Sequence, residues 1–188
     1  MNGNIHSMIS CIILAGGEGK RVDHSDKGLI NFHNKPLVAH VIASIESQVD
    51  DIVISANRNI DQYKRFSPTV ISDLSGRHGP LAGIAAALPA CQHDLVLIVP
   101  CDMPSLPDDL VSKLLTSLGD NEIAIVDIEN HFQLVFLMRR SLLACVQQHM
   151  SSEKYKLMQW VKSCSYVAIN FDDSTDCFIN MNSKTDLI

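Results

Sequence analysis

The stretch SCIILAGGEGKR at residues 10–21 decides the fold class of this chain. Its apolar first part, residues 10–14, is typical of a buried strand. The glycines that follow let the backbone turn sharply and bring N–H groups against an anion. Two cations, Arg21 and Lys27, can neutralise negative charge that the backbone dipoles would leave. The pattern indicates a strand followed by a phosphate loop, with a nucleoside triphosphate as the expected ligand.

Two common phosphate loops do not match this stretch. A P-loop would place Gly at 14 and Ser or Thr at 21, where the chain has Leu14 and Arg21. A dinucleotide fingerprint counted from Gly17 would need a glycine at 22, which is Val22. What remains is a strand, the pattern L-A-G-G-x-x-x-R, and the D-K-G of residues 26–28. The plain alternative is a glycine-rich hairpin with surface cations.

Composition narrows the class of protein. The 188 residues are 46% hydrophobic and 19% charged, so the chain can bury a full core, and we expect a single domain over residues 1–188 with residues 1–8 flexible. No apolar run is long enough for a membrane span, and the start of the chain lacks the pattern of a signal peptide. The six cysteines form no C-x-x-C and the eight histidines no H-x-x-x-H. We therefore expect reduced, mostly buried thiols and a cytoplasmic protein.

The charge distribution argues for a local anion site. A net charge of −6 is opposite to that of a typical nucleic-acid binder. Four cations nevertheless fall close together beside the glycine loop: Lys20, Arg21, Lys27 and Lys35. A polyphosphate site on an acidic protein needs such a cluster, although a solvated basic face would have the same pattern.

Apolar β-branched runs alternate with helical patterns along the chain, which is typical of an α/β fold with a mainly parallel sheet. The predicted strands are residues 10–14, 51–56, 69–72, 95–99, 123–128, 134–138 and 166–171. The predicted helices are residues 38–49, 79–88, 107–118, 140–150 and 154–162, the third opened by Pro107 in its first turn.

Polar residues follow several of these strands, and ligands of open parallel sheets bind beyond the carboxyl ends of the strands. Ser55 and Asn57 follow the second strand, Asp73 the third and Asp102 the fourth. Mg²⁺ prefers one or two protein carboxylates together with phosphate oxygens and water, which makes Asp102 the predicted metal ligand. The alternative for Asp102 is a turn or helix-cap aspartate, and S-D-L-S-G around Asp73 is also an ordinary turn sequence.

The combined pattern resembles the nucleotidyltransferases, which use a Rossmann-like sheet to move a nucleoside monophosphate onto an acceptor. Within them it is most similar to the molybdenum cofactor guanylyltransferase family. The motifs that carry this similarity run in order along nearly the whole chain: L-A-G-G at 14–17 with Arg21, D-K-G-L at 26–29, K-P-L at 35–37, A-N-R at 56–58, G-P-L-A-G at 79–83, P-C-D-M-P at 100–104 and N-M-N at 180–182. Gly16 and Met103 favour guanine, because related cytidylyltransferases differ at these positions.

The resemblance implies a Rossmann-like three-layer fold and transfer of GMP from GTP to molybdopterin, with release of pyrophosphate. The residues it places at GTP are Leu14, Ala15, Gly16, Gly17, Lys27, Ser55, Asp73 and Asp102. Arg21, Lys27 and Asp102 would be catalytic, and Asp102 would hold Mg²⁺ or Mn²⁺. Asn180 and Asn182 would contact the pterin or order their own loop. Molybdoenzymes or their chaperones are the implied protein partners.

Two other functions fit the same residues. One is a different small-molecule nucleotidyltransferase, which would use CTP or a sugar-phosphate acceptor. The other is a non-catalytic protein that binds and delivers a nucleotide or cofactor. Nucleotide preference and product formation would discriminate among the three.

Overall fold

A seven-stranded sheet forms the centre of the computed structural model, which describes residues 8–15, 26–73, 79–152 and 155–181. The predicted flexible start lies, except for Met8, outside these residues. The strands in their order across the sheet are β5 (Thr69–Ile71), β4 (Asp51–Ser55), β1 (Ile9–Leu14), β6 (Leu95–Pro100), β8 (His131–Arg139), β7 (Ile123–Ile128) and β9 (Tyr166–Asn170).

The sheet is mainly parallel, as predicted. β1 lies between β4 and β6 and runs parallel to both, β5 is parallel to β4, and β9 is parallel to β7. β8 is the exception, because it runs antiparallel to both β6 and β7. It also begins at His131, three residues before the predicted start, since Glu129 and Asn130 adopt left-handed φ values of 50° and 62° and close a tight hairpin with β7.

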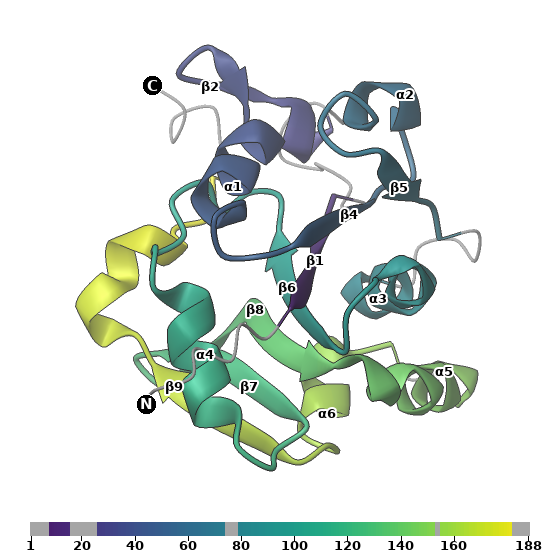
Figure 1. The fold of residues 1–188 in the computed structure, drawn as a ribbon, viewed down its shortest axis with the longest axis vertical. Coiled ribbons are helices and arrows are strands. Elements are labelled where there is room, and N and C mark those ends of the chain that lie inside the picture. Colours follow the sequence, from purple (N-terminus) through teal and green to yellow (C-terminus); the bar gives the residue numbers. More distant parts are fainter. Residues whose placement is uncertain (1–7, 16–25, 74–78, 153–154, 182–188) are drawn as a thin grey trace.

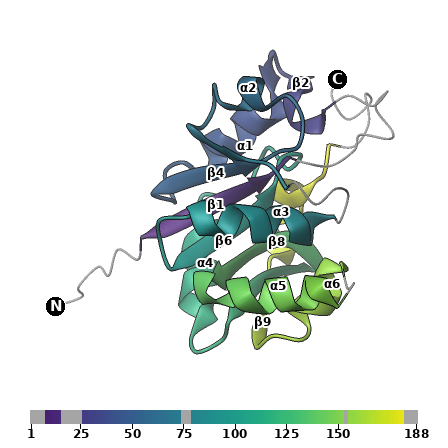
Figure 2. The same ribbon diagram turned by 90° about the vertical axis from the view of Figure 1, so that its right-hand side faces the viewer.

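Helices cover both faces of the sheet and complete the predicted three layers. Figure 1 shows α1 (Leu37–Ile45) and α4 (Leu110–Leu118) on one side of the central strands and α3 (Pro80–Ala87) on the other. Figure 2 looks onto that second side, where α5 (Leu143–Ser151) and α6 (Leu157–Val161) lie beside α3. Each face buries its own apolar cluster against its helices. The predicted fold class is confirmed.

Two helix boundaries differ from the prediction because of one side chain, Gln48. Its amide donates to the carbonyls of Ser44 and Pro107, at 3.0 Å each, and its Oε1 accepts from the amide of Val111 at 3.0 Å. These bonds satisfy the amide of Val111 in the first turn of α4 and add a second donor to the Pro107 carbonyl, which also accepts from the amide of Leu110 at 3.2 Å. As a result α1 ends at Ile45 instead of residue 49, and α4 begins at Leu110, after Pro107.

The other differences concern short elements. The sequence patterns did not predict the hairpin β2 (Asn31–Phe32) and β3 (Lys35–Pro36), the single-turn helix α2 (Ile60–Tyr63), or the 3-10 segments η1 (Lys27–Leu29), η2 (Leu88–Ala90) and η4 (Asp172–Phe178). A further 3-10 turn, η3 (Arg140–Leu142), precedes α5, and α6 is shorter than predicted. In the described parts of the chain, no helix is long and apolar enough to cross a membrane.

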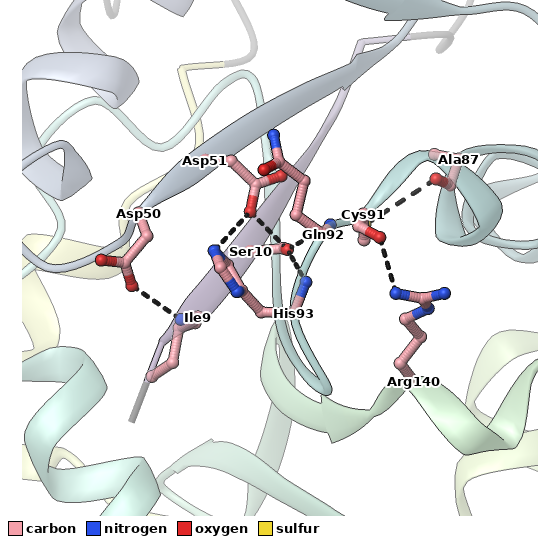
Figure 3. A network of polar contacts seen from close by, with 9 residues as sticks. All are labelled: Ile9, Ser10, Asp50, Asp51, Ala87, Cys91, Gln92, His93 and Arg140. Atoms are coloured by element: carbon pink, nitrogen blue, oxygen red, sulfur yellow. Dashed lines mark hydrogen bonds and ion pairs between the residues drawn. The ribbon is translucent and has the colours of Figure 1, made fainter. Parts of the chain in front are cut away.

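A network of polar contacts connects the amino ends of β1, β4 and β6 (Figure 3). The buried hydroxyl of Ser10 donates to Asp51 Oδ1 at 2.5 Å and accepts from the backbone amides of Gln92 and His93 at 3.1 and 3.0 Å. His93 Nε2 lies 3.4 Å from the same carboxylate oxygen. Because the strands are parallel, this network lies at the opposite edge of the sheet from the residues predicted to bind nucleotide.

Candidate active site

The carboxyl ends of β1, β4 and β6 meet at one edge of the sheet and bring together several of the predicted residues. Leu14 pairs with Ser55 on one side and Pro100 on the other. The ladder continues beyond the strands, because the amide of Ala15 donates to the Ser55 carbonyl at 2.7 Å and the amide of Cys101 donates to the Leu14 carbonyl at 3.1 Å. Gly16, Gly17, Lys20 and Arg21 lie outside the described residues.

An ion pair at this edge joins two predicted site residues. Lys27 Nζ lies 3.0 Å from Asp102 Oδ2, and their side chains are 21% and 12% exposed. Lys27 opens the 3-10 turn η1, whereas Asp102 follows β6, a strand that is buried at every position except its first. An ammonium and a carboxylate that are both partly withdrawn from water interact more strongly than an exposed pair. The contact places a cation and an anion side by side where the predicted triphosphate and metal would sit.

The C-terminal segment around Met181 is hydrogen-bonded to the turn that carries Asp102. The amide of Met181 donates to the backbone carbonyl of Asp102 at 2.9 Å, which brings the neighbouring, exposed Asn180 to the Asp102 turn. Contact of Asn180 with the pterin stays a prediction. Asn182 lies outside the described residues.

Ser55 lies at this edge but its side chain is buried, with 3% exposure. Its hydroxyl faces α3, where a Cβ added at Gly83 would lie only 2.7 Å from Ser55 Oγ. Gly83 thus lets the helix approach the strand closely. The Ser55 hydroxyl thus packs closely against α3, and contact of this residue with GTP stays a prediction.

Asp73 and Asn57 form a second cluster, after β5 and β4. Asn57 Nδ2 donates to Asp73 Oδ1 at 2.9 Å, and Asn57 Oδ1 accepts from the amide of Asp73 at 2.9 Å and from the hydroxyl of Ser72 at 3.1 Å. Asn57 therefore fixes both the backbone and the carboxylate of Asp73. A carboxylate fixed in this way can accept from the N–H groups of a nucleotide base or ribose hydroxyls.

The Asp102 carboxylate at this edge is an oxygen donor of the kind that fits Mg²⁺. Within the described ranges, no group of three or more His, Cys, Asp or Glu side chains is placed to hold a metal ion. A single carboxylate, Asp102, together with phosphate oxygens of the predicted nucleotide and water, would be a donor set that Mg²⁺ accepts. Cys101, next to it, is an unsuitable metal ligand, because burial and then the charge of Asp102 raise the pKa of its thiol well above the ordinary range.

A hydrogen-bonded cluster around the Lys27 turn, with Asp26 and Tyr63 buried and Asn59 exposed, was not predicted. Asp26, Asn59 and Tyr63 are joined by hydrogen bonds, although Tyr63 lies 37 residues from Asp26 in the chain. The D-K-G motif identifies Lys27 as a candidate site residue, but no local pattern indicates which distant side chains hold the turn. The only available signal was the presence of a carboxylate directly before the key lysine.

The fold and this edge define the class of protein: a nucleotide-binding α/β domain of the nucleotidyltransferase type. The chain belongs to the family of the MobA-like NTP transferase domain, whose model matches residues 11–167.

Relatives along the full length agree with this membership. The chain is 38% identical over 179 residues to the molybdenum cofactor guanylyltransferase of Shewanella piezotolerans, covering 93% of this chain and 88% of the relative. It is 35% identical over 178 residues to the protein of the same name from Aliivibrio salmonicida, covering 94% and 92%.

Solved structures share the fold. One is the molybdopterin-guanine dinucleotide biosynthesis protein A of Archaeoglobus fulgidus, with a TM-score of 0.76 at 20% identity over 95% of this chain and 94% of that one. Another is a putative protein of Aquifex aeolicus, with a TM-score of 0.80 at 19% identity and 97% of both chains covered.

Proposed function

We propose that this chain transfers GMP from GTP to the terminal phosphate of molybdenum-molybdopterin and releases pyrophosphate. The observation that carries the proposal is the ion pair of Lys27 and Asp102 at the carboxyl edge of the sheet, 3.0 Å apart, in a chain whose full-length relatives bear the name molybdenum cofactor guanylyltransferase. The cation suits the phosphates of the nucleotide and the carboxylate suits the metal that accompanies them.

The residues would act mainly by binding and orientation. Lys27 and Arg21 would bind the triphosphate oxygens, and the backbone N–H groups of the glycine loop would hold the phosphates. Asp73 would hold the nucleoside end of GTP. Asp102 would hold Mg²⁺, which when bound neutralises the charge that develops on the phosphate oxygens. Asn180, next to the residue bonded to Asp102, would orient the acceptor, together with Asn182.

The reaction needs little proton transfer from the protein. The attacking group is a phosphate, already ionised near neutral pH, so no general base has to remove a proton from it. The His93–Asp51 contact, which could serve as a base elsewhere, lies at the amino ends of the strands. Rate acceleration would come from alignment of the two phosphates and from stabilisation of charge, as is general for this type of transfer.

The function is tested by product formation. Purified protein is incubated with molybdate-loaded molybdopterin, Mg²⁺ and either GTP or CTP, and the dinucleotide product is followed by chromatography. We expect product with GTP only. CTP-only turnover would retain the class of reaction and overturn the base assignment, whereas no turnover with either nucleotide, beside an active control enzyme, would favour a delivery protein or another acceptor.

We also propose that the protein acts in the cytoplasm and passes its product to other proteins. All six cysteines are free thiols, which suits the reducing cytoplasm. A dinucleotide cofactor must be passed on after synthesis, so we propose that molybdoenzymes or their chaperones receive the product.

A further inference from the structure

The turn that carries Lys27 is held by a buried carboxylate, Asp26. This side chain is only 9% exposed as a residue, and both of its oxygens have partners. The hydroxyl of Tyr63 donates to Oδ1, and the amide of Asn59 donates to Oδ2 at 3.1 Å. Burial of a carboxylate is costly unless its oxygens are hydrogen-bonded. The residue directly before Lys27 is thus fixed by two side chains from the start and the end of α2.

The residue directly after Lys27 is fixed by the same tyrosine. A Cβ added at Gly28 would lie 2.5 Å from the Tyr63 hydroxyl oxygen, 3.2 Å from its Cε1 and 3.3 Å from Cys101 Cβ. Tyr63 is fully buried, so the ring cannot move away without opening the core. Glycine at 28 allows the turn to lie directly on the ring.

Backbone bonds close the turn around Lys27. The amide of Leu29 donates to the Asp26 carbonyl at 3.0 Å, and the amide of Ile30 donates to the Lys27 carbonyl at 3.1 Å. With Asp26 and Gly28 both fixed, the Cα–Cβ direction of Lys27 is set. The side chain then extends toward Asp102, where its ammonium is found.

We propose that Tyr63 and Asn59 are positioning residues: by fixing Asp26, they hold the Lys27 ammonium beside Asp102, where it binds the phosphates of the nucleotide. The part that concerns the nucleotide rests on the proposed function. Burial, then the neighbouring Cys101 and the bond to Asp26, raise the pKa of Tyr63 far above its ordinary value. The hydroxyl therefore keeps its proton and remains the donor of this bond throughout the pH range of enzymes.

A double-mutant cycle separates positioning of Lys27 from general stabilisation. The variants are Tyr63→Phe, which keeps the ring and removes the hydroxyl, Lys27→Met, and the two combined. Binding of GTP with Mg²⁺ is measured at equilibrium. We expect Tyr63→Phe to weaken binding about 5- to 10-fold in the native background and by less than about 2-fold when Lys27 is already methionine. An equal effect in both backgrounds, or no effect in the native one, would overturn the proposal.

Two further variants control this cycle. Ser67→Ala removes a hydroxyl that is equally buried and lies between α2 and β5, but bonds to the carbonyl of Ile52 at 2.7 Å instead of to Asp26. We expect it to leave GTP binding unchanged. Asn59→Gly removes the second bond to Asp26 while retaining the left-handed backbone, φ 51°, that glycine accepts freely. Asn59→Gly should weaken GTP binding as Tyr63→Phe does. If Tyr63→Phe does not fold, Asn59→Gly takes its place in the double-mutant cycle with Lys27→Met.

A readout without nucleotide tests positioning by itself. Lysines are methylated reductively with ¹³C-formaldehyde, and the Lys27 methyl resonance is assigned from its absence in Lys27→Arg. Asp102→Asn should shift this resonance in the native chain, and the shift should shrink at least about 2-fold in the Tyr63→Phe chain. An equal shift in both chains would overturn positioning. Failure of native protein to bind GTP would instead count against the proposed function, with the resonance still deciding positioning.

Discussion

The Lys27 ammonium lies 3.0 Å from the Asp102 carboxylate, although 75 residues separate the two in the chain. Lys27 precedes the first helix and Asp102 follows the fourth predicted strand, so only the crossover topology brings them together. Both are mostly withdrawn from water, which strengthens their interaction. The pair links the part of the site expected to bind phosphates to the part expected to hold the metal.

Asp102→Asn should reduce turnover by about 100-fold or more without unfolding the protein, because it keeps the shape of the side chain and removes the charge that would hold the metal. The rate is measured with saturating GTP and Mg²⁺, and folding by thermal denaturation. Asp109→Asn is the matched control, because Asp109, the N-cap of α4, forms an exposed ion pair with Lys113 at 2.9 Å. Retention of Mg²⁺-dependent activity in Asp102→Asn would exclude the metal role.

Lys27→Met should weaken the binding of GTP and strengthen the binding of a divalent metal ion. Loss of the ammonium weakens GTP binding by about 10-fold, the usual scale for one charge-assisted hydrogen bond. It also removes a positive charge 3.0 Å from Asp102, so Mn²⁺ without nucleotide should bind more tightly than to the native chain. Electron paramagnetic resonance of Mn²⁺ measures the second effect. Unchanged or weaker Mn²⁺ binding would show that the ion pair does not compete with the cation.

Much of this site could be predicted from the sequence, because the informative residues stand at the ends of strands. Asp102 comes shortly after a strand of unbroken apolar residues, and Lys27 follows a glycine-rich stretch in a recognisable motif. The carboxyl ends of neighbouring parallel strands necessarily meet, so strand prediction alone places Ser55 and Asp102 at the same edge.

What could not be predicted depends on long-range contacts. β8 has the composition of any buried strand. It is antiparallel because a hairpin joins it to β7, and the alternation of apolar runs and helical patterns in the sequence does not show this hairpin. Gln48 ends one helix and starts another by bonds to Pro107 and Val111, far along the chain. Tyr63 resembles an ordinary core residue in the sequence, and only the folded chain shows that its hydroxyl reaches Asp26.

Gly83→Ala should destabilise the protein by about 1–3 kcal/mol, the range for overpacking a well-packed interior. The new methyl group would lie 2.7 Å from Ser55 Oγ and 3.2 Å from Leu14 Cδ2. Urea denaturation measures the loss. In the Ser55→Ala background the closest atom is absent, so the same substitution should cost less. If Gly83→Ala costs the same in both backgrounds, the contact between α3 and Ser55 does not limit the approach of the helix.

Ser10→Ala should lower the free energy of unfolding by about 1–3 kcal/mol and leave the turnover rate unchanged. The hydroxyl has three partners, Asp51 and the amides of Gln92 and His93, and its loss leaves buried groups without a bond (Figure 3). The rate should not change, because this network lies at the amino ends of the strands. A reduced rate in the folded variant would contradict the separation of the two edges.

Stability should fall at alkaline pH, and Cys91 should contribute to the fall. Burial, followed by the charge of Asp51, raises the pKa of this thiol from 9.0 to about 12. The folded chain therefore keeps a proton that the unfolded chain releases, so the contribution of Cys91 to stability is complete below pH 9 and is lost progressively as the pH rises toward 12. Urea midpoints at about pH 8 and about pH 10.5 measure the loss. It should be smaller in Cys91→Ala than in the native chain or in Cys177→Ala, a half-buried thiol; an equal loss in all three would contradict the assignment.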